Sequence, residues 1–135
     1  MNELPDTIFN RNKFLKTLPP SFDGVYDWSW TKGCFGKTKI TPTDLDAIIE
    51  RNGNFLVFET KTPGILVPQG QMILLNRLVD TRFFTIMIIW GKKYPEKFLT
   101  MFPNGGEREY FGIEEAKKIV KYWFNYADRQ KRTKD

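Results

Sequence analysis

The sequence of 135 residues contains no histidine and only one cysteine, Cys34. Without histidine, the chain cannot build a catalytic triad or dyad that relies on imidazole, and it has no imidazole to bind zinc. A single cysteine cannot form an internal disulfide, which favours a reducing compartment. Any catalysis must therefore use carboxylates, lysine, arginine, tyrosine or hydroxyl groups.

Long hydrophobic runs are also missing. No apolar stretch approaches the length of a membrane span, and residues 1–6 lack the basic and apolar regions of a signal peptide. We therefore expect a cytoplasmic protein without a membrane partner. The glycine and lysine spacing of a P-loop is absent too, so nucleotide hydrolysis is not expected.

The composition predicts one folded domain. Hydrophobic residues make up 41% of the chain and aromatic residues 16%, which is enough for a core without metals or disulfides. We expect a single domain over residues 1–135, with a basic, frayed tail from about residue 129. That tail either contacts DNA non-specifically or simply aids solubility.

The net charge of +5 is unevenly distributed. Residues 1–40 carry six basic and four acidic groups, and residues 91–135 carry eleven and seven. Residues 41–90 carry four basic groups against five acidic ones. An acidic centre between basic flanks suits a metal-dependent enzyme that acts on a polyanion, although a basic excess alone is common in small soluble proteins.

The central residues 46–61 are typical of a β-hairpin. Two apolar-rich runs, 46–49 and 55–58, flank a segment that contains Asn52 and Gly53. Both of these residues tolerate the positive φ of a tight turn. The second run is apolar on both faces, which predicts a central strand covered on both sides.

Two carboxylates and an ammonium group are expected to meet at one end of this hairpin. Side chains alternate along a strand, so Glu59 and Lys61 share a face. Closure of the turn predicts Asp46 roughly opposite Lys61 and within reach of Glu59. Oxygen ligands of this kind suit Mg²⁺, and Lys61 could orient an attacking hydroxide. The pattern indicates phosphodiester hydrolysis, although an exposed Glu–Lys ion pair has the same spacing.

These residues resemble the split motif of the PD-(D/E)XK nuclease superfamily. Asp46 leads into an apolar strand, Glu59 and Lys61 follow on the next strand, and Gln71 stands near the start of the next helix. Over residues 40–78 the chain is most similar to the small Holliday junction resolvases and the VRR-Nuc nucleases. The resemblance implies that all four residues are catalytic, and that Asp46 and Glu59 bind Mg²⁺, which Mn²⁺ can replace.

Gln71 has helical spacing with Leu74, Leu75 and Leu78, which predicts that it lies on a packed face. A polar side chain on such a face needs a partner. A catalytic lysine, a water, a DNA phosphate or an ordinary backbone carbonyl would each serve.

The superfamily often adds a further carboxylate to the metal site, and this chain offers several candidates. Residues 5–18 predict a short helix, and residues 24–30 predict a strand with an aromatic face that suits a core, a dimer interface or base stacking. The candidate carboxylates in or near these segments, or just before the hairpin, are Glu3, Asp6, Asp27 and Asp44.

Basic residues predict two contacts with the DNA backbone. Residues 31–39 form a glycine-spaced loop that contains Lys32, Lys37 and Lys39; a mobile solvated loop would have the same composition. Lys92 and Lys93 follow a predicted buried strand over residues 83–90.

The remaining segments complete an α/β pattern. Residues 98–102 and 108–111 predict a second hairpin, and residues 113–130 predict an amphipathic helix. We expect a single α/β domain, with a central mixed sheet flanked by helices as in restriction endonucleases.

The expected function is Mg²⁺-dependent cleavage of branched DNA by a homodimeric junction resolvase that acts in recombination or repair. A phage-encoded protein acting in the host cytoplasm would fit this size by analogy. Two alternatives stay open: a flap or single-strand nuclease of the VRR-Nuc type, and a non-catalytic DNA-binding module on the same fold.

Overall fold

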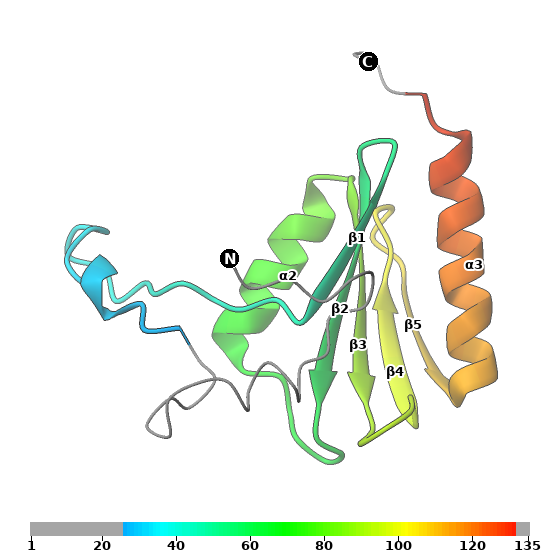
Figure 1. The fold of residues 1–135 in the computed structure, drawn as a ribbon, viewed down its shortest axis with the longest axis horizontal. Coiled ribbons are helices and arrows are strands. Elements are labelled where there is room, and N and C mark those ends of the chain that lie inside the picture. Colours follow the sequence, from blue (N-terminus) through cyan, green and yellow to red (C-terminus); the bar gives the residue numbers. More distant parts are fainter. Residues whose placement is uncertain (1–25, 132–135) are drawn as a thin grey trace, which may run out of the picture. The chain divides into compact units, whose positions relative to one another are not determined.

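The structure is a computed structural model that describes residues 26–131. The chain divides into two compact units, Met1–Pro42 and Thr43–Asp135. In the first unit, the described residues 26–42 contain one short 3-10 helix, η1 (Ser29–Thr31), and turns. The second unit contains the sheet and both α-helices (Figure 1).

A five-stranded mixed sheet forms the centre of the second unit, as predicted. The strands lie in chain order, and only the β2–β3 pair is parallel; the other pairs are antiparallel. The strands are β1 (Ala47–Arg51), β2 (Asn54–Lys61), β3 (Phe84–Trp90), β4 (Lys97–Met101) and β5 (Glu107–Phe111).

The β1–β2 hairpin is closed at the predicted Asn52–Gly53 pair, by a turn of two residues. Asn52 and Gly53 have φ angles of 50° and 81°, as a type I′ turn requires. The Asn52 amide also donates hydrogen bonds to the carbonyl oxygens of Ala127 and Asp128, at 3.2 and 3.3 Å, at the end of the last helix. The turn is therefore anchored to another element.

The hairpin register corrects one expectation from the sequence. Ala47 pairs with Phe58, so the ladder, continued by one residue, sets Asp46 beside Glu59 and not opposite Lys61. The physical reason is the tightness of the turn, which pairs Arg51 directly with Asn54 and leaves no slack in the register.

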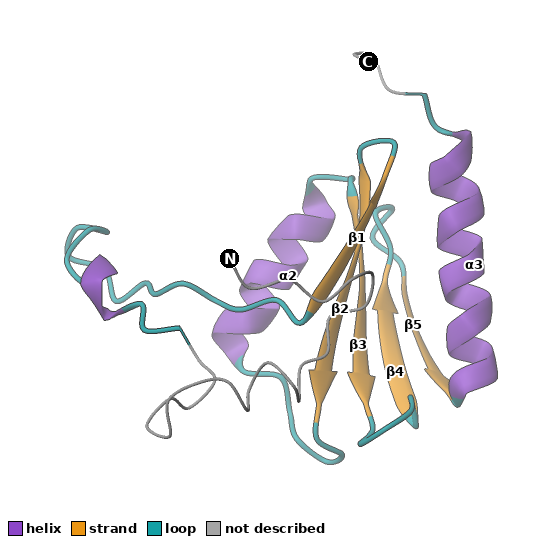
Figure 2. Cartoon of the chain, viewed as in Figure 1, coloured by secondary structure: helices purple, strands orange, loops and turns teal. Residues whose placement is uncertain are grey.

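Two helices cover the two faces of the sheet (Figure 2). Helix α2 (Gln69–Asp80) connects the parallel strands β2 and β3, and Leu75 packs with Val57 and Ile86. On the other face, helix α3 (Ile113–Arg129) packs Trp123 against Leu56 and Phe98 from the sheet. The predicted α/β class, with helices flanking a mixed sheet, is confirmed.

The predicted strand over residues 24–30 is wrong for its described part. Residues 26–28 have no regular structure and η1 follows. Local hydrogen bonds explain the difference: Asp27 Oδ1 accepts the Ser29 amide at 2.9 Å, and Thr31 Oγ1 donates to the Trp28 carbonyl at 2.8 Å. Such side-chain bonds compete with strand pairing.

Some expectations fall on residues that the structure does not describe. The predicted helix over residues 5–18, the carboxylates of Glu3 and Asp6, and the end of the basic tail at residues 132–135 lie outside the described residues. Within residues 26–131, no helix combines the length and apolar character needed to cross a membrane.

Candidate active site

Glu59 is the most unusual polar residue of the sheet. It lies near the end of β2, on the face that α2 covers, and only 5% of it is exposed. Its Oε1 lies 3.5 Å from the Nζ atom of Lys61, two residues along the same face. Its Oε2 is buried and has no hydrogen-bond partner among the described residues. A buried carboxylate oxygen without a donor is costly, which makes this atom a candidate ligand.

Lys61 is the last residue of β2, and its side chain is 18% exposed. Its carbonyl oxygen accepts the Gly91 amide at 3.3 Å, and it pairs with Trp90 in the sheet. Sheet pairing therefore holds the Lys61 backbone in place. Its ammonium group is partly exposed to solvent and lies beside the buried Glu59 carboxylate.

Asp46 lies directly before β1 and is held by Thr60. Its Oδ2 accepts hydrogen bonds from the Thr60 amide at 2.7 Å and from the Thr60 hydroxyl at 2.8 Å. These two bonds fix the carboxylate beside the Glu59–Lys61 segment. Within residues 26–131, the Oδ1 atom has no hydrogen-bond partner and remains able to bind another group.

Gln71 lies in the first turn of α2, one helical turn before the buried Leu75. Its Oε1 is buried and, within the described part of the chain, also lacks a hydrogen-bond partner. Helix α2 begins at the end of the sheet where β2 ends (Figure 1), and it covers the face that carries Val57, so Gln71 belongs to the first turn of the helix that covers the Glu59 face. The predicted packed position of Gln71 is confirmed.

The donor set can be tested against the divalent cation that the sequence suggests. Three buried side-chain atoms lack a hydrogen-bond partner among the described residues: Glu59 Oε2, Gln71 Oε1 and, on β4, Thr100 Oγ1. The first two are oxygen acceptors of the candidate site, and Asp46 adds a second carboxylate. Oxygen atoms are the ligands that Mg²⁺ prefers, and it often takes only one or two carboxylates. No group of three or more acidic or cysteine side chains in residues 26–131 is arranged to hold a metal. The donor types therefore suit Mg²⁺, and the hydrogen bonds of the Asp46 carboxylate go to Thr60, whose side chain alternates with those of Glu59 and Lys61 along β2.

Two other candidate carboxylates, Asp44 and Asp27, lie within the described residues. Asp44 lies on the exposed stretch before β1, without a described contact to the site residues. Asp27 belongs to the first unit, where its carboxylate accepts the Ser29 amide. The backbone and hydroxyl hydrogen bonds from Ser29 lower the pKa of Asp27 below its ordinary value of 3.8.

The predicted DNA-binding lysines fall into two groups. Lys92 and Lys93 are exposed on the loop between β3 and β4, which the Gly91 amide ties to Lys61 at the candidate-site end of the sheet. The second group, in the first unit, is exposed on turns and consists of Lys32, Lys37 and Lys39.

Two residues near the site were not singled out by the sequence. Thr60 holds Asp46, but threonine is so common in strands that no sequence signal marks it. Trp90 pairs with Lys61, and its indole donates a 2.6 Å hydrogen bond to the Ile65 carbonyl in the loop that leads to α2. An indole at the end of an apolar strand was the available signal, because a tryptophan N–H that is partly withdrawn from water usually finds an acceptor.

Comparison with known proteins adds nothing to these observations: no protein-family model, no curated protein and no solved structure matches the chain.

Proposed function

We propose that this protein is a metal-dependent DNA endonuclease whose active site consists of Asp46, Glu59, Lys61 and Gln71. The single observation that carries the proposal is the buried Glu59 carboxylate, which pairs with Lys61 through one oxygen and has no donor for the other among residues 26–131. A purely structural ion pair would satisfy both oxygens or stay in solvent.

The carboxylates of Asp46 and Glu59 would hold Mg²⁺ or Mn²⁺, with the Gln71 amide oxygen nearby. When bound, such a cation lowers the pKa of a coordinated water and neutralises charge on phosphoryl oxygens. Thr60 fixes the Asp46 carboxylate through two hydrogen bonds, so this ligand is oriented before a substrate arrives.

Lys61 supplies the positive charge of the reaction. Its ammonium group, held 3.5 Å from Glu59, would donate hydrogen bonds to the attacking water or to a non-bridging phosphate oxygen. A donor fixed in a partly dry site is worth more than the same group in water. Lys92 and Lys93, on the adjacent exposed loop, would bind the DNA backbone at this end of the sheet.

Within this class we favour branched DNA, processed by a homodimer in recombination or repair. The sequence resemblance to the small junction resolvases supports this choice, and so does symmetry, since two copies related by a twofold axis would present two sites to one junction. A cytoplasmic, phage-encoded enzyme would be consistent with it.

The test is cleavage of a labelled four-way junction, with a linear duplex and a flap alongside, in Mg²⁺ and in EDTA. The native protein is compared with Glu59→Gln and with Glu107→Gln, which changes an exposed carboxylate on β5. Paired symmetric nicks that need Mg²⁺, vanish in Glu59→Gln and persist in Glu107→Gln are expected.

The other outcomes separate the alternatives. Cleavage of the flap or duplex alone would keep the nuclease and reject junction specificity. Tight junction binding without cleavage of any substrate would reject the enzyme and favour a DNA-binding module.

A further inference from the structure

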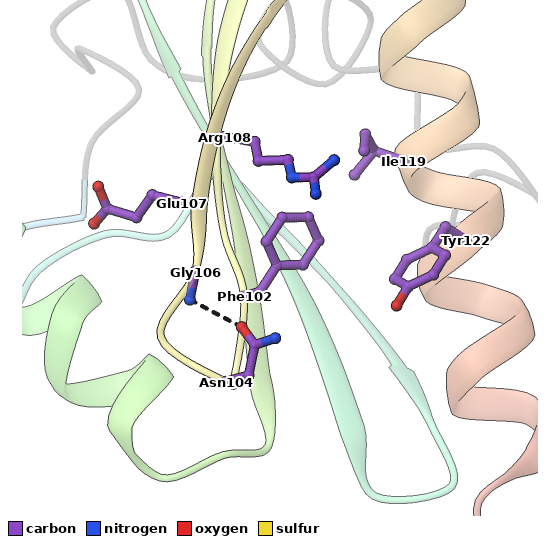
Figure 3. Close-up of a pocket in the computed structure, with 7 residues that line it drawn as sticks. All are labelled: Phe102, Asn104, Gly106, Glu107, Arg108, Ile119 and Tyr122. Carbon is purple, nitrogen blue, oxygen red and sulfur yellow. Dashed lines mark hydrogen bonds between the residues drawn. The ribbon is translucent and has the colours of Figure 1, made fainter.

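A second site lies on the face of the sheet opposite Glu59. A cavity of about 320 Å³ opens between the β4–β5 turn and α3. Because β4 runs antiparallel to β3, this turn stands near the start of β3, at the opposite end of the sheet from Lys61. The residues whose side chains or backbone line it include Phe102, Asn104, Gly106, Arg108, Ile119 and Tyr122 (Figure 3).

Aromatic rings from both sides form the walls of this cavity. Phe102 follows β4 and Tyr122 projects from α3, and their rings lie 6.3 Å apart in an edge-to-face arrangement. Tyr122 is 61% exposed, so its ring is open to a ligand. A smaller adjoining cavity of about 120 Å³ shares both residues and extends the aromatic surface to Tyr126.

The polar groups of the cavity are hydrogen-bond donors held in place. Arg108 points from β5 toward α3 (Figure 3), and its Nη1 donates a 2.9 Å hydrogen bond to the Tyr110 hydroxyl. This hydrogen bond raises the pKa of Arg108. The Asn104 Oδ1 accepts the Gly106 amide at 2.8 Å, which leaves the Nδ2 donor free to turn toward a ligand.

Glu107, the acidic residue among the described residues that line the cavity, faces elsewhere. Glu107 is next to Arg108 on β5, and its side chain points away from the cavity in Figure 3. Alternation along the strand explains this direction, because neighbouring side chains point to opposite faces. The cavity therefore combines open aromatic rings, one fixed guanidinium and one amide, without a carboxylate pointing inward.

We propose that this cavity binds an unpaired nucleobase of single-stranded DNA. The base would stack on Tyr122, its polar edge would meet the Asn104 amide, and Arg108 would contact the adjoining phosphate. Single-strand sites elsewhere are built from this same combination, stacking rings beside cationic groups. A purely apolar ligand would not use Arg108 or Asn104, and the volume falls in the range of small-ligand pockets.

This inference rests on the proposed function only in taking DNA as the ligand. The cavity and the Glu59–Lys61 pair lie on opposite faces and at opposite ends of the sheet, so a base held here is not the one beside the cleaved bond. A strand bound in the cavity would instead hold a single-stranded arm of the substrate away from the cutting site.

The test uses the full chain and a short oligodeoxynucleotide that carries one 2-aminopurine, whose fluorescence is quenched by stacking. Binding is measured in EDTA, so that no cleavage interferes. The variants are Tyr122→Leu and Arg108→Gln. Their controls are Phe111→Leu, an exposed aromatic residue on the other face of β5, and Arg77→Gln, an exposed arginine on α2.

The native protein is expected to quench the probe, and Tyr122→Leu to lose the quenching and bind about tenfold more weakly. Arg108→Gln should weaken binding and reduce its salt dependence. Equal binding and quenching in Tyr122→Leu and Phe111→Leu, or no quenching by the native protein, would overturn the proposal.

Glu59→Gln distinguishes this inference from the nuclease proposal. Quenching that persists in Glu59→Gln while cleavage is lost would support both. Quenching by a native protein that cuts no DNA would reject the nuclease and keep the base-binding site.

Discussion

Replacement of Glu59 and Lys61 together by methionine is expected to make the protein more stable in the absence of divalent cations. The Glu59 carboxylate is buried; its Oε2 has no donor among residues 26–131, and its Oε1 lies 3.5 Å from Lys61. A side chain selected for folding alone would be apolar here, because the neighbouring positions of the same face, Val57 and Ile88, are fully buried. A polar residue in such a place points to a functional constraint.

The size of the effect follows from two opposing terms. An unsatisfied buried polar atom costs about 1–3 kcal/mol, and more when it is charged. The lost attraction to Lys61 reduces the gain, but that side chain is 18% exposed and keeps access to water. Exchanging both members of a buried ion pair for apolar residues is often neutral or stabilising by about 1–4 kcal/mol, whereas removing one member leaves an unpaired charge and costs stability. We therefore expect the double variant Glu59→Met/Lys61→Met to gain about 1–2 kcal/mol, which is a rise in Tm of roughly 4–8 °C.

Urea and thermal unfolding in EDTA measure this effect, and the single variant Glu59→Met, which leaves the Lys61 ammonium unpaired, provides the control. The double variant should be at least as stable as the single one. Added Mg²⁺ should stabilise the native protein by about 2.7 kcal/mol at a hundredfold excess over Kd, and should leave both variants unchanged. A loss of stability in EDTA for both variants would refute the reasoning, because Glu59 would then be a structural residue.

Three further predictions concern other parts of the molecule. Gly91→Ala should lose about 1–3 kcal/mol in urea unfolding, because an added Cβ overlaps the Tyr94 carbonyl oxygen. Asn52→Ala should lower the free energy of unfolding by about 2 kcal/mol in the same measurement. Alanine is strained at a φ of 50°, and the change removes the hydrogen bonds to α3. Asn52→Gly should lose less stability, because glycine tolerates this angle. Ser29→Ala should raise the pKa of Asp27 in an NMR titration without restoring 3.8, because the backbone hydrogen bond remains. Since that pKa is lowered by folding, the turn is stabilised above pH 3.8 and weakens as the pH falls through the folded value.

Local sequence patterns predicted the regular elements of the second unit well. The Asn52–Gly53 turn, the run 55–58 and the strand before Trp90 were each identified, because their signals lie within a few neighbouring residues. The strand predicted over residues 24–30, which is wrong for its described part, also rested on a local signal. Alternating aromatic residues suggested a strand, but nothing local showed that Asp27 would instead bond the Ser29 amide.

The candidate site was only partly predictable. Alternation along one strand placed Glu59 and Lys61 on a common face, and the spacing of leucines placed Gln71 on a packed one. The sequence predicted the wrong cross-strand partner for Asp46. The partner depends on the number of residues in the turn, and the spacing of the apolar runs does not fix that number.

The sequence by itself determined which side chains are available for chemistry and indicated most strands and helices of the second unit. The absence of histidine can be read directly from the sequence, and so can the apolar run that ends in Glu59 and Lys61. Only the tertiary structure decided that the Glu59 carboxylate is buried with a free oxygen, that Thr60 holds Asp46, and that an aromatic cavity opens beside Arg108. The physical reason is that burial and partnership depend on contacts between residues distant in sequence. These contacts exist only once α2 and α3 have packed onto the two faces of the sheet.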